Sequence, residues 1–288
     1  RIPYNTHHYG IQYYYGTVLD TWNGFCARPS FLDLFKSKTA PSVSESDLFD
    51  NSKMKGYYNS DLRGPGTELQ GTSNEKTWGW FVGQVNKKGS TTELYLDEDV
   101  VDKENPKGTP TVLHVGVSSL TNAHNFDGAR LNKWELDKTG TYKYCENDFH
   151  IFRYADVLWM KIEAVLRGGA GSVSSVTSSA DFKTLMARSF AYDANPEQAF
   201  RDAYGDVDSW TLDDVLAERG REFTWEMVRR RDLIRYGKYN DIQYVTDAKA
   251  KEPVRKWFPI PYSVLEKSLI DKTTGQKIWT QTPGYENL

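Results

Sequence analysis

Apolar side chains recur at every third or fourth position between residues 211 and 239, and this spacing predicts one long helix. The positions that form its apolar stripe are Leu212, Val215, Leu216, Phe223, Met227 and Ile234. Thr211 followed by Asp214 is a capping-box start, and Gly237 provides a natural helix end. Most other positions carry charge, so acids and arginines cover the remaining faces of the predicted helix.

A second helix is predicted from Asp156 onward, within the segment FHIFRYADVLWMKIEAVLR at residues 149–167. Its apolar positions nearly encircle the helix axis, which is typical of a buried element. They are Val157, Leu158, Met160, Ile162, Val165 and Leu166. Gly168 and Gly169 are expected to end this helix, because glycine accepts the left-handed backbone of a helix terminus.

The next stretch, GGAGSVSSVTSSA at residues 168–180, has a small and polar composition, and we expect a flexible or disordered loop there. Helical spacing returns in DFKTLMARSFAY at residues 181–192 and in NPEQAFRDAYG at residues 195–205. The sequence therefore predicts two further helices before the long one begins.

Turn-forming residues recur throughout residues 1–145 with weak helical periodicity, which predicts a loop-rich lobe. Pro29 is expected to open a short helix, and the alternation in residues 111–119 predicts a strand. The glycine-rich residues 64–89 predict an exposed loop. The whole pattern predicts a mainly α fold, with residues 146–288 as a helical scaffold that forms one structural unit with the lobe.

The composition narrows the possible functions. The 288 residues carry a formal charge of −3, which argues against a nucleic-acid-binding protein. No apolar run is long enough to span a membrane, and no signal peptide opens the chain, which we expect to be a mature fragment or C-terminal part. Cys26 and Cys145 could pair in an oxidising compartment, but two buried free thiols are the simpler interpretation.

Several segments share a resemblance. ERGREFTWE followed by RRRDLIRYGK, at residues 218–238, resembles the signature helix of the SusD/RagB family, with Met227 where the family usually has glycine. RYADVLWM at residues 153–160 is similar to a second family motif. GARLNKWE, WFPIPYSVLEKS and the final QTPGYENL resemble further family segments, and they occur in the family's order.

The resemblance implies a SusD-like fold, with tetratricopeptide-like helices in an N-terminal part that this sequence does not contain. It implies a glycan-binding protein without enzymatic activity on the surface of a Gram-negative outer membrane. The ligand would be an oligosaccharide or polysaccharide, and the partner a SusC-like TonB-dependent transporter. Contact with the membrane would run only through an N-terminal lipid anchor, which is likewise implied by the family and absent from this sequence.

The acids of the long helix suggest an alternative, because a glycoside hydrolase needs two facing carboxyl groups. Glu218, Glu222 and Glu226 recur at helical spacing, but arginines within one turn of each should keep all three ionised. We therefore favour a structural role, assign no catalytic residue, and predict that Glu163 pairs with Arg219 or Arg229. A helical adaptor for protein partners is the other alternative.

Aromatic residues form 14% of the chain, and exposed rings can stack on the C–H faces of sugars. Trp78 and Trp80 are the first candidates, because they share one face if their segment is extended. The alternative is that both side chains fix the loop to the core. The further candidates are Trp22, Asn23, Phe25, Tyr57, Tyr58 and Arg63.

Metal or cofactor sites are not expected. The histidines, His7, His8, His114 and His124 among them, lack metal-binding spacing. The acidic run at residues 96–104 offers oxygen ligands of the kind calcium prefers, but it lacks the glycine and spacing of an EF-hand loop. We interpret it as a solvated acidic turn, with calcium as the alternative.

Overall fold

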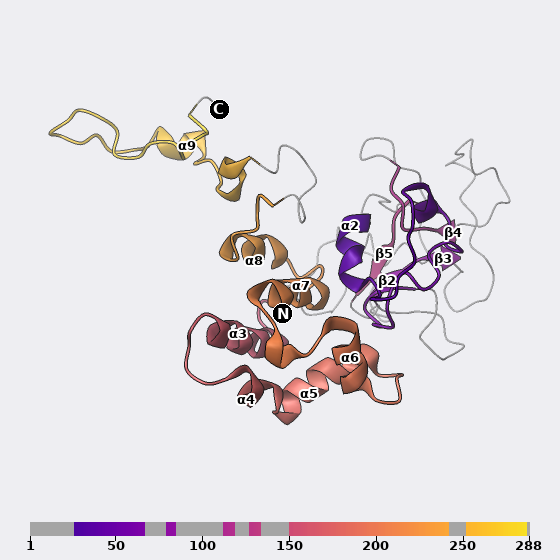
Figure 1. Cartoon of the computed structure of the whole chain (residues 1–288). Coiled ribbons are helices and arrows are strands. Elements are labelled where there is room, and N and C mark those ends of the chain that lie inside the picture. Colours follow the sequence, from indigo (N-terminus) through magenta and orange to yellow (C-terminus); the bar gives the residue numbers. More distant parts are fainter. Residues whose placement is uncertain are drawn as a thin grey trace, which may run out of the picture. The chain divides into compact units, whose positions relative to one another are not determined.

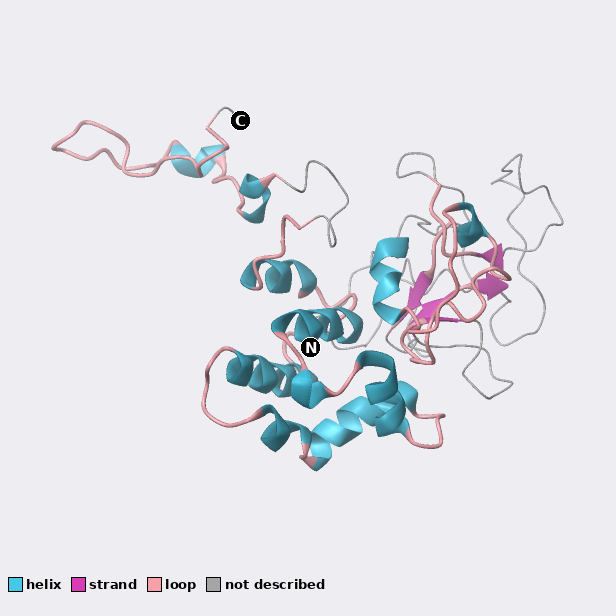
Figure 2. Cartoon of the chain, viewed as in Figure 1, coloured by secondary structure: helices cyan, strands magenta, loops and turns pink. Residues whose placement is uncertain are grey.

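The computed structural model describes residues 26–66, 79–84, 112–118, 127–133, 150–241 and 252–286, and it contains two compact units, Arg1–Val228 and Arg229–Leu288. The described residues are mainly helical, as predicted, with a few short strands (Figure 2). None of the helices in these ranges combines the length and the apolar character needed to cross a membrane. The predicted boundary after residue 145 between lobe and scaffold stays a prediction.

The first unit contains six α-helices in its described part (Figure 1). They are α2 (Pro29–Leu32), α3 (Tyr154–Leu166), α4 (Val173–Thr177), α5 (Ala180–Ala187), α6 (Pro196–Tyr204) and α7 (Leu212–Glu222). Short 3₁₀ helices are η2 (Asp33–Phe35), η3 (Ser46–Phe49), η4 (Arg188–Phe190) and η5 (Val207–Ser209). Pro29 opens α2 as predicted, and the helices predicted at residues 181–192 and 195–205 are confirmed as α5 with η4 and as α6.

The strands form two small sheets among the loops. They are β1 (Pro65–Gly66), β2 (Gly79–Phe81), β3 (Gly83–Gln84), β4 (Val112–Leu113) and β5 (Arg130–Asn132). In the first sheet β2 is central, parallel to β1 and antiparallel to β5, with Trp80 opposite Leu131. The second sheet pairs β3 with β4, so the strand predicted at residues 111–119 is present but short. These sheets surround a core that includes Leu32, Phe35 and Trp80.

Trp80 therefore corrects the prediction of an exposed loop at residues 64–89. The described part of that segment includes the central strand β2, and the side chain of Trp80 is 2% exposed. Gly79 is required there, because its φ is +79° and a Cβ atom would lie 2.5 Å from the carbonyl oxygen of Leu62. Trp80 is therefore packed into the core, whereas Trp78 lies outside the described residues.

The helices of the first unit enclose a second core, which we call the aromatic cluster. Its members are Trp159, Phe182, Phe190, Phe200, Tyr204 and Trp210. Trp159 of α3 stacks on Trp210 at 5.5 Å between ring centroids and meets Phe182 of α5 edge to face at 4.9 Å. These six aromatic side chains therefore pack with one another in a core.

The helix α3 follows the second predicted helix, and Gly168 and Gly169 end it as expected, with amides bound to Val165 and Ala164. The prediction that α3 is buried on nearly all sides is wrong. Val157 and Met160 are 39% and 37% exposed, because α3 packs against α4 and α7 and leaves one face uncovered.

The serine-rich segment at residues 168–180 is not disordered, which corrects the prediction. Ser172 caps α4 through a capping box with Ser175, and Ser179 caps α5 by accepting a hydrogen bond from the amide of Phe182. Val173 and Thr177 are buried, so apolar contacts hold α4 in place. Serines, which are common in flexible linkers, therefore serve as helix caps in this segment.

The predicted long helix is in fact two helices. Its start is confirmed, since Thr211 and Asp214 form a reciprocal capping box at α7. The helix ends at Glu222, and the following turn holds Trp225 and Met227 at positive φ angles of 67° and 59°. Residues with a side chain rarely adopt this backbone, so the turn excludes a continuous helix.

The second unit begins with α8 (Arg229–Arg235) and continues through η6 (Pro253–Lys256) and α9 (Tyr262–Leu265). Gly237 ends α8 at a φ of +71°, as predicted, and the amide of Lys238 binds the carbonyl of Leu233. Arg230 links α8 to η6, because its guanidinium lies 4.4 Å from the ring centroid of Phe258 and donates to two carbonyls of η6.

Candidate functional site

The last turn of α7 places two glutamates among cations from four other segments. Glu218 and Glu222 are 1% and 2% exposed. They lie on the same face of the helix because they are four positions apart. Glu226 follows in the turn after α7 and is 5% exposed. These acids and their partners form a set that we call the ionic network: Asp61, Glu218, Glu222, Glu226, Arg63, Lys133, Arg153, Arg188 and Arg221.

Arg63 joins the loop before β1 to α7. Its guanidinium donates to Asp61 at 2.7 Å, to Glu218 at 2.8 Å and to Glu222 at 2.9 Å. The hydroxyl of Tyr204 also donates to Asp61, at 2.8 Å. Burial tends to raise the pKa of Asp61, but its bonds with Arg63 and Tyr204 outweigh that effect, and the net pKa lies below the ordinary value.

Glu222 lies at the centre of the network. Arg153 is 2.6 Å from its carboxylate, Arg188 also pairs with it, and Arg63 is the third guanidinium in contact. Burial tends to raise the pKa of Glu222, but these cations lower it by more than burial raises it. The net pKa is therefore well below the ordinary value. Glu222 is therefore ionised near neutral pH and unsuited to donate a proton as a general acid.

Cations also explain why α7 ends where it does. Lys133 and Arg153 donate to the backbone carbonyl of Glu222 at 2.8 and 2.9 Å, and Lys133 donates to the carbonyl of Thr224 at 3.1 Å. These carbonyls would otherwise accept bonds within a continued helix, and positive groups are favoured at a helix C-terminus. The same two cations bind Glu226, which the turn brings beside them.

Arg219 has a different role from the rest of α7's charges. It is fully buried, and it donates to Asp156 of α3 at 2.7 Å. This is a buried ion pair between the two helices, as the hypothesis expected, although the hypothesis named Glu163 as the acid. Glu163 is 2% exposed and binds Arg167 at 2.8 Å. The predicted pairing of Glu163 with Arg219 or Arg229 stays a prediction.

A cavity of about 430 Å³ lies against this network in the first unit. Among its lining residues are Arg63, Trp80, Lys133, Arg153, Arg188 and Ser189. Its volume falls within the range of roughly 300–1,000 Å³ that is typical of small-ligand sites. The wall contains an indole ring, hydrogen-bond donors and several cations, which together are suited to bind a polar ligand with apolar faces.

Backbone pairing brings the cavity's wall together from segments far apart in sequence. The amide of Trp80 binds the carbonyl of Arg63 at 3.1 Å, and the amide of Leu62 binds the carbonyl of Ser189 at 2.8 Å. Within the described residues, the indole N–H of Trp80 and the hydroxyl of Ser189 are buried without a hydrogen-bond partner. Buried polar groups are usually satisfied, so these two are exceptions within the described part of the chain.

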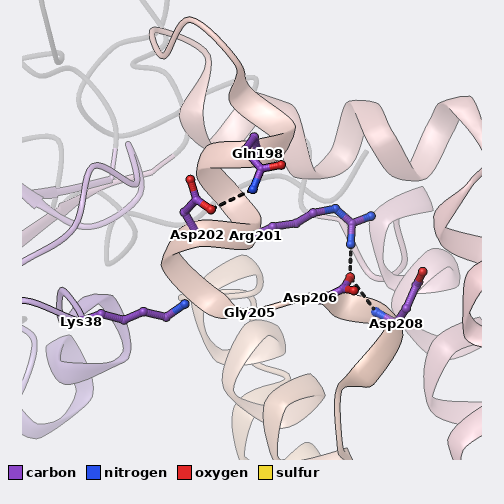
Figure 3. A pocket seen from close by; sticks show the side chains of 7 residues that line it. All are labelled: Lys38, Gln198, Arg201, Asp202, Gly205, Asp206 and Asp208. Carbon is purple, nitrogen blue, oxygen red and sulfur yellow. Dashed lines mark hydrogen bonds and ion pairs between the residues drawn. The ribbon is translucent and has the colours of Figure 1, made fainter.

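A second pocket, of about 680 Å³, lies along α6 and the loop after it (Figure 3). Its polar and charged side chains bind one another: Arg201 pairs with Asp206, and the amide of Gln198 donates to Asp202 at 2.8 Å. Figure 3 also shows Lys38 opposite these residues, and no aromatic ring is among the lining side chains. This pocket therefore fits a sugar less well than the cavity beside α7.

Two of the eight predicted ligand-binding residues, Arg63 and Trp80, line the same cavity. Tyr57 and Tyr58 pack edge to face at 5.0 Å, and the hydroxyl of Tyr57 donates to Asp33 at 2.9 Å. The four remaining residues lie outside the described part of the chain: Trp22, Asn23, Phe25 and Trp78. The ligand-binding assignment of all eight stays a prediction.

Other residues that line the cavity were not predicted from the sequence, among them Lys133, Arg153, Arg188 and Ser189. Lys133 and Arg153 occur in the two short segments that support the family resemblance, so their motifs were a usable signal. Arg188 and Ser189 begin η4, where no motif marks them. Their position depends on the packing of α5 and η4 against the rest of the unit, which periodicity does not reveal.

Other predicted sites remain untested. Cys145, His7, His8 and His124 lie outside the described residues, as does the acidic run at residues 96–104. His114 is described: its Nε2 lies 3.4 Å from the carboxylate of Asp127, and its Nδ1 donates to the carbonyl oxygen of Gly116 at 3.0 Å. In the described ranges no group of three or more potential ligands is arranged to hold a metal ion.

Comparison with known proteins identifies a family. The sequence profile of the SusD family matches residues 3–285, which is nearly the whole chain. A search of curated proteins found no match.

Proposed function

The chain belongs to the SusD family, and from this premise we propose that it captures an oligosaccharide at the cell surface and passes it to a SusC-like TonB-dependent transporter. Members of this family are glycan-binding proteins of nutrient uptake and not enzymes. A lipid anchor would hold the protein at the outer membrane of a Gram-negative bacterium, as the family implies.

One observation carries the binding proposal: the cavity beside α7 combines the indole of Trp80 with the N–H donors of Arg63 and Arg188. A sugar presents apolar C–H faces and many hydroxyl groups, so it needs both a ring and hydrogen-bond partners. Trp78 belongs to the same proposal, because it precedes β2 directly. Affinity in the micromolar to millimolar range, about −8 to −4 kcal/mol, would suit a protein that must release its ligand.

The ionic network argues against hydrolysis. Each of its glutamates contacts at least two cations, and the pKa of Glu222 is lowered. A glycosidase needs one carboxyl group that stays protonated near neutral pH. We therefore assign the acids to the scaffold, where they position Arg63 and Arg153 at the cavity wall.

Calorimetric titration of the protein with a panel of oligosaccharides tests this function. We expect one or more glycans to bind, and Trp80→Phe and Trp78→Ala to weaken binding, because the first replaces the indole at the cavity wall by a smaller ring and the second removes a ring. Trp279→Phe is a matched control, since Trp279 belongs to the second unit and is not among the residues that line the cavity. Release of reducing ends from any bound glycan would contradict the proposal.

Transfer to a transporter is tested separately. A SusC-like barrel encoded with this protein should co-purify with it from detergent-solubilised membranes. Failure of the two proteins to associate, with glycan binding intact, would leave capture as the function and remove the transporter from it.

A further inference from the structure

The second unit exposes most of its large apolar side chains. Within its described residues, Leu233 and Tyr285 are the apolar side chains that are buried. Eight others are between 41% and 72% exposed: Trp257, Phe258, Tyr262, Val264, Leu269, Ile270, Ile278 and Trp279. A surface that gathers large apolar side chains in this way marks a site of interaction.

Backbone and side-chain hydrogen bonds bring these residues close together. After α9 the chain forms a narrow hairpin, in which the amide of Ile278 donates to the carbonyl of Leu269 at 2.9 Å (Figure 1). The side chain of Gln281 binds both the amide and the carbonyl of Ile260, at 2.7 and 3.1 Å, so the chain on either side of α9 is joined. We call the eight exposed residues the apolar patch.

Positive charge accompanies the apolar patch. Residues 229–288 contain twelve Lys and Arg against seven Asp and Glu, a formal charge of +5, whereas residues 1–228 contain 24 against 32, a formal charge of −8. Between residues 256 and 281 there are four lysines and two acids. The ammonium of Lys256 lies 5.9 Å from the ring centroid of Trp257. The second unit therefore presents apolar and positive groups together.

This mixture fits a lipid surface better than a protein or a glycan. The cores of protein interfaces are depleted in lysine, whose ammonium group is costly to desolvate. On a bilayer, the stem of a lysine lies over the apolar region while its ammonium group reaches the headgroups, and Trp and Tyr favour the same boundary. A glycan would stack on the rings but would leave Leu269, Ile270 and Ile278 in water.

We propose that the second unit docks on a bilayer surface rich in anionic phosphate headgroups. The apolar patch enters the boundary between headgroups and acyl chains, and the lysines beside it pair with phosphates. This contact adds to the proposed lipid anchor, because an acyl chain and a basic surface together attach a protein more firmly than either alone. It is independent of glycan capture, since the residues that line the cavity beside α7 belong to the first unit.

Sedimentation of the full chain with vesicles tests the docking. The probes are vesicles of phosphatidylcholine and phosphatidylglycerol in equal amounts, compared with vesicles of phosphatidylcholine alone. We expect binding to the anionic vesicles to be about tenfold tighter, because each lysine near an anionic surface contributes about fivefold. The preference should fall as salt concentration rises. Tryptophan emission should shift to shorter wavelength on binding, and the double variant Trp257→Phe with Trp279→Phe should lose this shift.

Further variants separate charge from apolar contact. Lys267→Gln combined with Lys272→Gln should weaken binding to anionic vesicles about tenfold and leave neutral vesicles unaffected. Ile270→Ser should weaken binding to both kinds of vesicle. All three side chains are exposed, so the melting temperature should not change. Lys183→Gln and Val157→Ser are matched controls, because these residues are also exposed but belong to the first unit.

Several outcomes would overturn the proposal. Absence of vesicle binding, or equal binding to anionic and neutral vesicles, would exclude an anionic lipid surface. Binding that survives Ile270→Ser and the double lysine variant would place the contact elsewhere. A lower melting temperature of Ile270→Ser would show that the patch packs within the folded chain. A dimer in light scattering that Ile270→Ser dissociates would assign the patch to a second copy. Each of these results would leave glycan capture standing if the oligosaccharide panel binds.

Discussion

The aromatic cluster and the ionic network lie in the same unit and are both buried, yet they gain stability in different ways. The cluster packs rings such as Trp159, Phe182 and Trp210 at centroid distances of 4.9 and 5.5 Å. The network surrounds Glu222 with guanidinium groups at 2.6 and 2.9 Å. Ring packing depends on shape and on exclusion of water, whereas the network depends on the ionisation of every member.

Tyr204 belongs to both regions and shows how they meet. Its ring packs against Phe200 at 5.3 Å, while its hydroxyl donates to Asp61 and the guanidinium of Arg221 lies 3.6 Å from its centroid. Burial and the charge of Asp61 raise the pKa of Tyr204 well above the ordinary value. The phenol therefore stays neutral and offers its proton to the network at all physiological pH values. The difference between the regions should appear in how each responds to pH.

The largest expected loss comes from the aromatic cluster. Trp159→Ala should lower the free energy of unfolding by about 3–5 kcal/mol, because it opens a cavity beside several rings. Chemical denaturation at pH 7 and pH 4 measures this loss, which should be the same at both values, since no charge is removed. Trp159→Phe keeps a ring at the site and should cost much less. A loss with Trp159→Ala that depends strongly on pH would break the distinction between the regions.

A second variant tests the ionic network. Glu222→Gln should lower the free energy of unfolding by about 3 kcal/mol at pH 7, because it leaves buried cations without their shared carboxylate. The folded pKa of Glu222 is depressed, so its contribution is complete above the unfolded value of 4.5 and is lost as pH falls toward the folded value. The difference between the wild type and the variant should therefore shrink below about pH 4.5.

Glu252→Gln is the matched control for this experiment. Glu252 pairs with Arg255 at 3.0 Å, but its side chain is 50% exposed, so its removal should change stability little at any pH. A difference between wild type and Glu222→Gln that stays constant down to pH 3 would mean that Glu222 contributes packing and not charge.

The smallest effect concerns the turn that brings Glu226 into the network. Met227→Gly should raise the free energy of unfolding by up to about 1 kcal/mol, because glycine accepts a φ of 59° without the strain of a side chain. The side chain of Met227 is 85% exposed, so its loss removes little packing. Met227→Ala keeps the strain and should give no gain. Thermal melting of both variants decides the matter, and a stabilised Met227→Ala would indicate an effect of the exposed methionine itself.

The local signals in the sequence explain much of the fold. Thr211 and Asp214 cap α7, Pro29 opens α2, and Gly168 and Gly237 end helices, each through contacts within a few residues. The glycine that the SusD family usually has at position 227 was also a local signal. A family preference for glycine predicts a positive φ, and hence a turn between α7 and α8, so the break in the long helix was open to prediction from the resemblance.

The candidate site was only partly predictable. Arg63 and Trp80 were proposed from their residue types, but the expected exposure of Trp80 was wrong because strand pairing on both sides of β2 buries it. The serines at 172 and 179 were assigned to a disordered loop, because composition does not show that Val173 and Thr177 find a core to pack on. Such contacts join residues far apart in the chain.

The sequence alone determined the family, the mainly helical class and the ends of several helices, since caps and periodicity act over a single turn. Only the tertiary structure decided which cation meets which acid: Arg219 binds Asp156, and Arg63, Arg153 and Arg188 converge on Glu222. Coulomb energy depends on distances of a few ångströms in a buried setting, and these distances are set by long-range packing that no local pattern encodes.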